Sequence, residues 1–178
     1  MSYTVKEILN RLVAPALGCT EPVAVALAAA AAASLLPGKT IESLRVAVDP
    51  NVLKNGLGVN IPGSKGLKGL DLAAALGALI GRPDLKMEVL NGLNPEILTA
   101  AKALTASGRV VVELLPETRG LTIHCTLHAG GKQSESIIQG AHDQIVDLRL
   151  NRKTVQDSLL LRSAETSGNG SRGDLDVW

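Results

Sequence analysis

The sequence predicts an α+β fold, in which buried, alanine-rich helices pack on a mostly antiparallel sheet. Helical patterns with one strand pattern fill the chain as far as residue 108, and strand patterns follow one another from residue 110 to residue 150. Two of the helical runs are apolar almost all round, which is typical of helices that are buried. The pair Gly130-Gly131 separates two later strand patterns, as a hairpin turn does. Helices followed by a run of strands are typical of α+β domains.

Composition narrows the classes of function. The chain has 178 residues, a net charge of +1, no phenylalanine, one tyrosine and one tryptophan. Aromatic side chains that could stack on bases are nearly absent and the charges form no basic stripe, so we expect neither nucleic acid nor a membrane as a partner. Two distant cysteines form no disulfide framework, and the first residues do not resemble a signal peptide. Both features favour a reducing cytoplasm.

The length suits one domain, which we expect at residues 1–150. A weakly structured segment is expected at 151–178. Its polar, glycine-rich tail is predicted to be disordered from about residue 165.

The first element is an amphipathic helix at residues 4–14. Thr4 and Glu7 form a capping box at its start, and Pro15 ends it. Its apolar residues share one face at helical spacing, namely Val5, Ile8, Leu9 and Leu12.

A buried helix follows, because Ser34 is the only polar residue between positions 23 and 36. That run is shorter than the ~20 apolar residues that a membrane-spanning helix needs. Thr20 or Glu21 is the expected N-cap, Pro22 falls in the first turn, and a Pro-Gly pair ends the helix.

A strand at 43–49 leads into a glycine-rich segment at 49–70, which is predicted to be a long loop. Glycines in such a loop let the backbone approach a ligand closely, and free N–H groups there can bind an anion. Lys54 and Lys65 could add positive charge. An ordinary structural loop with turn glycines explains the pattern equally well.

The remaining elements are identified from their start and stop signals. Asp71 caps a second alanine-rich helix that Gly81 ends, and Asn94 with Pro95 begins a later one. The expected ranges are a helix at 71–81, a short helix or strand at 84–91, a helix at 95–108, strands at 110–115, 121–129, 134–140 and 144–150, and a further helix at 154–164.

Cys19 is the first candidate for chemistry, because it stands just before the buried helix in the turn Gly-Cys-Thr-Glu-Pro. A thiol at the positive end of a helix is shifted toward thiolate, the form that binds metals or attacks electrophiles. The competing interpretation is a small buried cysteine in a tight turn, which is common for a lone cysteine.

The other candidates are weaker. His124 and His128 lie on one face of a strand, about 13 Å apart, which is too far for both to bind one metal. Cys125 alternates with apolar neighbours and is expected in the core. His142 stands beside Asp143, a common surface pair. No nucleophile elbow and no zinc-ligand spacing occur.

Two stretches carry a resemblance to a known family. Residues 13–33 read VAPALGCTEPVAVALAAAAAA, and residues 48–81 read VDPNVLKNGLGVNIPGSKGLKGLDLAAALGALIG. Together they resemble the signatures of the L-cysteine desulfidase family, whose iron–sulfur relatives are the bacterial L-serine dehydratases. The strands as far as residue 150 resemble that family more loosely.

The resemblance implies an α,β-elimination that converts L-cysteine to sulfide, ammonia and pyruvate. It implies a [4Fe–4S] cluster held by three cysteines, one of which corresponds to Cys19. Glu21 would contribute to catalysis. The substrate, a small amino acid, would be bound by Thr20, Asn51, Lys54, Asn55 and Gly56.

The sequence departs from the family in length, because the half that carries the other cluster cysteines is absent. We therefore expect the chain to be an N-terminal domain that lacks the cluster by itself, and to need a C-terminal half or a second subunit. A free-standing domain that binds an amino acid or anion is the alternative. So is an oligomerisation domain, since an exposed apolar surface would favour a homo-oligomer.

Overall fold

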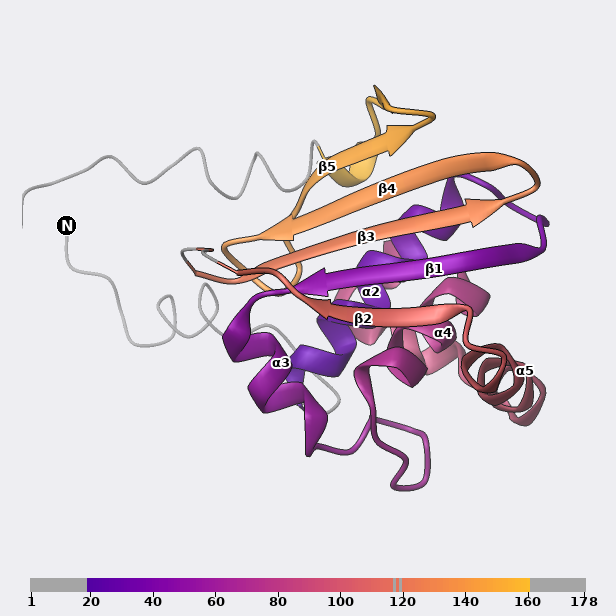
Figure 1. Cartoon of the computed structure of the whole chain (residues 1–178), viewed down its shortest axis with the longest axis vertical. Coiled ribbons are helices and arrows are strands. Elements are labelled where there is room, and N and C mark those ends of the chain that lie inside the picture. Colours follow the sequence, from indigo (N-terminus) through magenta and orange to yellow (C-terminus); the bar gives the residue numbers. More distant parts are fainter. Residues whose placement is uncertain (1–18, 117, 119, 161–178) are drawn as a thin grey trace, which may run out of the picture.

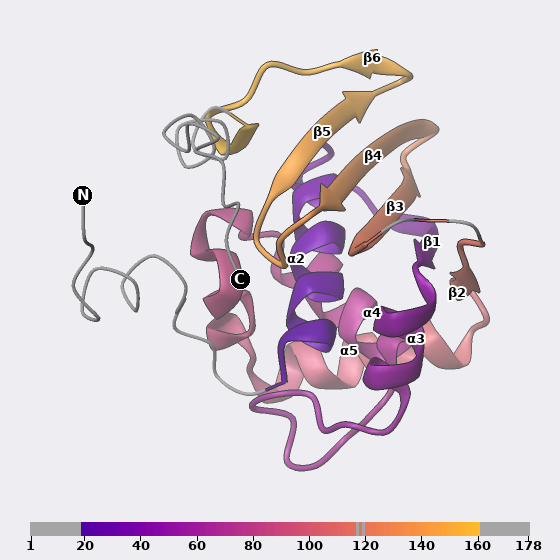
Figure 2. The same cartoon turned by 90° about the vertical axis from the view of Figure 1, so that its left-hand side faces the viewer.

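The computed structural model describes residues 19–116, 118 and 120–160. Helices gather on one face of a six-stranded sheet (Figures 1 and 2). The helices are α2 (Thr20–Ser34), α3 (Pro50–Leu57), α4 (Leu70–Ile80), the 3-10 helix η1 (Pro83–Gly92) and α5 (Pro95–Ala106). The strands are β1 (Ile41–Val48), β2 (Val110–Leu114), β3 (Thr122–Ala129), β4 (Lys132–Gln139), β5 (Ile145–Leu150) and β6 (Lys153–Thr154).

The sheet is mixed and mostly antiparallel, which confirms the predicted α+β fold. Its strand order is β2-β1-β3-β4-β5-β6. Among the described strands, β1 and β2 are the one parallel pair, because α3, α4, η1 and α5 intervene between them. The pair β1–β3 and all later pairs are antiparallel. Gly130 and Gly131 form the β3–β4 hairpin turn at positive φ, as predicted.

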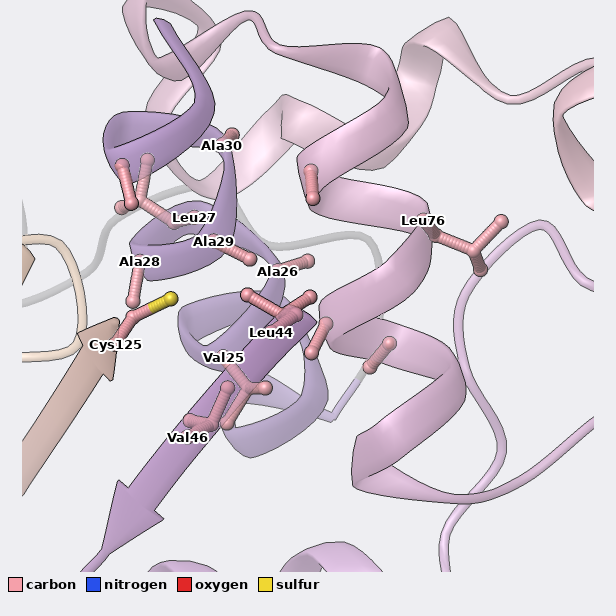
Figure 3. Close-up of a cluster of buried hydrophobic side chains, with 14 of the residues drawn as sticks. Val25, Ala26, Leu27, Ala28, Ala29, Ala30, Leu44, Val46, Leu76 and Cys125 are labelled. Carbon is pink, nitrogen blue, oxygen red and sulfur yellow. The ribbon is translucent and has the colours of Figure 1, made fainter. Parts of the chain in front are cut away.

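Helix α2 is the centre of the core. Every residue from Val23 to Ala32 is fully buried, as the sequence predicts. The sheet covers one side of α2, and α4 with η1 cover the others. Figure 3 shows Ala28 of α2 next to Cys125 of the sheet. Two serines of β4 form hydrogen bonds that join α2 to the sheet. The hydroxyl of Ser134 donates to the carbonyl of Ala32 (2.7 Å), and that of Ser136 to the carbonyl of Ala28 (2.6 Å).

The predicted loop at 49–70 is wrong in its first part, which forms α3. Asp49 caps this helix with its carboxylate and Pro50 occupies the first position, a combination that favours a helix start. Gly56 is tolerated because it packs against Leu70: a Cβ there would lie 2.4 Å from a Leu70 methyl group. The loop therefore begins only after Leu57.

Two predicted N-caps are also wrong by one or two residues. Cys19, in extended conformation, is the N-cap of α2, so Thr20 and Glu21 already belong to the first turn. Gly69 is the N-cap of α4 at φ 111°, a backbone conformation that glycine adopts readily and aspartate rarely adopts. Asp71 lies in the first turn of the helix.

Other boundaries follow the sequence signals. Asn94 caps α5 by accepting the N–H of Ile97 at 2.8 Å, and Gly81 ends α4 in the left-handed conformation. Residues 84–91 lie in η1, so the helical alternative holds there. The predicted helix at 4–14 and the tail from residue 165 lie outside the described residues. The predicted helix at 154–164 is wrong in its first part, because Thr154 belongs to β6 and residues 155–157 are not helical. Residues 158–160 are helical, and 161–164 lie outside the described residues.

Strand β6 lies just past the domain boundary expected at residue 150. None of the helices within residues 19–116 and 120–160 is long and apolar enough to cross a membrane.

Candidate functional site

The candidate site lies where the start of α2 approaches α3. The side-chain amide of Asn55 donates to Oε1 of Glu21 over 3.3 Å, although the two residues are 34 positions apart. This hydrogen bond joins the Gly-Cys-Thr-Glu-Pro turn to the stretch that begins after β1. The two most distinctive stretches of the sequence therefore meet in one place.

A pocket of about 290 Å³ opens at this junction. Its lining comes from four places in the fold: the first turn of α2, the start of α3, the residue before β3 and the connection between β4 and β5. The lining residues are Glu21, Asp49, Asn51, Val52, Asn55, Leu121 and His142. Carboxylates, amides and an imidazole in so small a space suit a small polar ligand.

The carboxylate of Glu21 accepts hydrogen bonds from neighbouring side chains. The thiol of Cys19 donates to its Oε2 at 3.0 Å, and the hydroxyl of Thr20 approaches the same oxygen at 3.4 Å. Burial alone would raise the pKa of Glu21. The hydrogen bonds from Cys19, the helix backbone and Asn55, with charge attraction from His142, outweigh burial and lower that pKa. Glu21 is therefore ionised at neutral pH.

The same contact acts on Cys19 in the opposite direction. Burial raises the pKa of the Cys19 thiol, and the hydrogen bond to Glu21 and its negative charge raise it further. Backbone N–H groups of the first turn lower the pKa, but by less. The expected shift toward thiolate is therefore wrong for this chain by itself, because the carboxylate two residues away and burial outweigh the helix terminus.

Asp49 fixes the geometry of α3. It is 1% exposed. Its Oδ1 accepts the N–H groups of Asn51 (2.8 Å) and Val52 (3.1 Å), and its Oδ2 accepts the N–H of Thr122 (2.8 Å). One carboxylate thus ties the first turn of α3 to the start of β3. This connection therefore fixes the positions of Asn51 and Asn55 beside the pocket.

The structure gathers only part of the predicted site. The pocket lining includes Glu21, Asn51 and Asn55. Cys19 and Thr20 do not line it, but their side chains contact Oε2 of Glu21. Lys54 is exposed on α3 and Gly56 is buried against Leu70, and neither lines the pocket.

The predicted site omits four lining residues, of which two have polar side chains: Asp49 and His142. Asp49 had a recognisable signal, because an aspartate directly before a proline is typical of a helix N-cap. His142 was interpreted as part of a common surface pair with Asp143, because only the β4–β5 connection brings it to the pocket.

The two histidines of β3 have separate surroundings outside the pocket. The ring of His124 lies 3.5 Å from a carboxylate oxygen of Glu135, and the ring of His128 forms a 3.2 Å hydrogen bond with Ser43. The two side chains therefore have different partners.

A [4Fe–4S] cluster does not fit the described residues alone. Cys125 is fully buried in the core beside Ala28 (Figure 3), and burial raises the pKa of its thiol to about 12. Ala28 is nine residues from Cys19 on α2, which is about 13 Å of helix, so the two thiols cannot share a cluster. The described part of the chain contains no group of three or more histidines, cysteines or acids that could hold a metal ion.

Comparison with known proteins gives sequence relatives. No family model and no solved structure matches the chain. It is 50% identical over 179 residues to a UPF0597 protein of Desulfatibacillum aliphaticivorans and 49% identical over 179 residues to one of Desulforapulum autotrophicum. Both matches cover the whole chain but 41% and 40% of the relatives.

A UPF0597 protein of Geobacter sulfurreducens is 46% identical over 142 residues, which are 80% of this chain and 33% of that protein. These names describe no activity, and none of them refers to cysteine desulfidase or serine dehydratase. The chain thus spans about two-fifths of the length of the first of these UPF0597 proteins, to which its sequence is similar throughout.

Proposed function

We propose that this chain carries one part of the active site of an iron–sulfur lyase that releases sulfide from L-cysteine or acts on a similar β-substituted amino acid. One observation supports this proposal above the others: the Asn55–Glu21 hydrogen bond joins the two stretches that resemble the desulfidase signatures. Since the chain spans about two-fifths of its relatives, the remaining polypeptide would supply the other cluster cysteines. Reduced cysteines suit the cytoplasm, which we propose as the location.

The pocket residues have the chemistry for binding an amino acid. The amides of Asn51 and Asn55 can donate hydrogen bonds to a substrate carboxylate, and the ionised Glu21 can pair with the substrate ammonium group. An elimination also requires a group that accepts the α-proton. Glu21 and His142 are the lining residues that we propose for moving that proton.

Asn55→Ala is expected to raise KM for L-cysteine by roughly 10-fold or more, because a hydrogen bond to a charged group contributes ~1.5–3 kcal/mol. The assay needs a longer protein, namely a chimera in which this chain replaces the matched segment of the Desulfatibacillum aliphaticivorans relative. Sulfide release would be followed after anaerobic reconstitution with iron and sulfide.

Asn60→Ala is the matched control, since Asn60 is an exposed asparagine outside the pocket. Its KM should stay within about twofold of the parent value, as for surface substitutions generally. An active chimera whose KM is the same with and without Asn55→Ala would contradict the assignment of the pocket.

A further inference from the structure

Strand β2 has one side on which no other described strand pairs with it. It stands at the end of the strand order and pairs with β1 alone among the described strands (Figure 1). The carbonyl of Arg109 accepts the N–H of Leu44 and the N–H of Leu115 donates to the carbonyl of Val48, so residues 109 and 115 face β1. Backbone groups alternate in direction along a parallel strand. Val110, Val112 and Leu114 therefore direct their N–H and C=O groups away from β1.

Within the described residues, this edge lacks the features that usually prevent strands from pairing at a sheet edge. The strand reads VVVEL, with no proline and no lysine. Its one charged residue, Glu113, forms an ion pair with Arg45 of β1. Natural edge strands are commonly protected by lysine, proline, a bulge or a covering element. A smooth apolar edge is instead a template for another strand.

Apolar surface gathers at the same edge. Three of the four exposed large hydrophobic residues in the described part of the chain lie there: Leu57 (59% exposed), Val111 (41%) and Leu114 (50%). The fourth is Val146 on β5. A groove of about 430 Å³ runs beside β2, lined by Leu53, Leu57, Gly69, Leu70, Asp71, Val110, Val111 and Val112.

The groove and the free backbone groups suit the same occupant. A strand paired with β2 would place every second side chain on the helix-covered side of the sheet, over the groove. Recognition of this kind takes affinity from main-chain hydrogen bonds and specificity from the side-chain pockets. The groove between Leu53, Leu57 and Leu70 is apolar and would accommodate aliphatic side chains at alternate positions of the added strand.

We infer that the β2 edge receives a β-strand, with aliphatic residues at alternate positions, from the polypeptide that makes up the remainder of the longer relatives. The length of those relatives supplies the occupant, since about three-fifths of the Desulfatibacillum protein lies outside the match. The strand would lie against α3, the helix that presents Asn51 and Asn55 to the candidate site. The inference depends on the surface and on the length of the relatives, and not on the lyase chemistry.

Hydrogen–deuterium exchange tests the inference without any activity. In this chain alone, the amides of Val110, Val112 and Leu114 should exchange close to the rate of free peptide. In the full-length Desulfatibacillum aliphaticivorans relative, the aligned amides should exchange at least ~100-fold more slowly, because they are paired there. Equally fast exchange in both proteins would overturn the inference.

Two other occupants give different results, and each overturns the inference. Protection in this chain alone that grows with concentration, together with a dimer in light scattering, would identify a second copy. Protection of a monomer that disappears when residues 1–14 are deleted would identify that segment.

A pair of variants gives a second readout. Val111→Lys should lower the melting temperature of the chimera by several degrees, whereas Val146→Lys, the same change at a residue of nearly equal exposure, should not. Equal effects of the two changes would count against an occupied edge.

Discussion

Replacing Gly77 by alanine is expected to destabilise the protein by about 3 kcal/mol, which is the upper end of the usual cost of overpacking a core. A Cβ at Gly77 would lie 1.9 Å from the carbonyl oxygen of Ala26. That oxygen belongs to the backbone of α2, which is buried on all sides and cannot move aside. Alanine is the better helix former by up to ~1 kcal/mol, but the clash between α2 and α4 is larger.

Thermal unfolding measures this effect. For a chain of this size about 3 kcal/mol corresponds to a fall of about 10 °C in Tm. Gly58→Ala is the matched control, because Gly58 has φ −97° and a Cβ added there would meet no atom within 4 Å. Its free energy of unfolding should change by less than ~0.5 kcal/mol. A Gly77→Ala protein as stable as the parent would show that α2 and α4 do not cross so closely.

Replacing Asp49 by alanine is expected to cost about 3 kcal/mol. Loss of the N-cap of α3 accounts for ~1 kcal/mol, and a buried N–H at Thr122 left without an acceptor adds ~1–3 kcal/mol. Urea unfolding measures the change in free energy.

Asp49→Asn separates the two contributions, because the side-chain amide keeps one acceptor oxygen. Its cost should be about half that of the alanine variant. Equal costs for both variants, or a cost below ~1 kcal/mol for alanine, would contradict the role of Asp49 as the tie between α3 and β3.

Local signals predicted most of the fold. The stop at Gly81, the cap at Asn94 and the turn at Gly130-Gly131 each depend on a backbone or side-chain preference of a few neighbouring residues, and each is where the sequence places it. The all-round burial of α2 followed from its lack of polar residues. These features need no knowledge of distant contacts.

The errors arose where a distant contact decides the outcome. Gly56 indicated a loop, but it lies within α3, where Leu70 packs so closely against it that only glycine leaves enough space. The Cys19 thiol was expected to favour thiolate from the helix terminus alone, whereas its pKa depends also on burial and on Glu21. His142 reaches the pocket only through the strand order of the sheet, which no local pattern in the sequence states.

Sulfide release from L-cysteine by the chimera, reconstituted anaerobically with iron and sulfide, tests the proposed lyase most directly. The expected result is sulfide together with equal amounts of ammonia and pyruvate, and its loss to background in the Cys19→Ala variant. A folded, iron-loaded chimera that releases no sulfide, or a Cys19→Ala variant as active as its parent, would contradict the proposal.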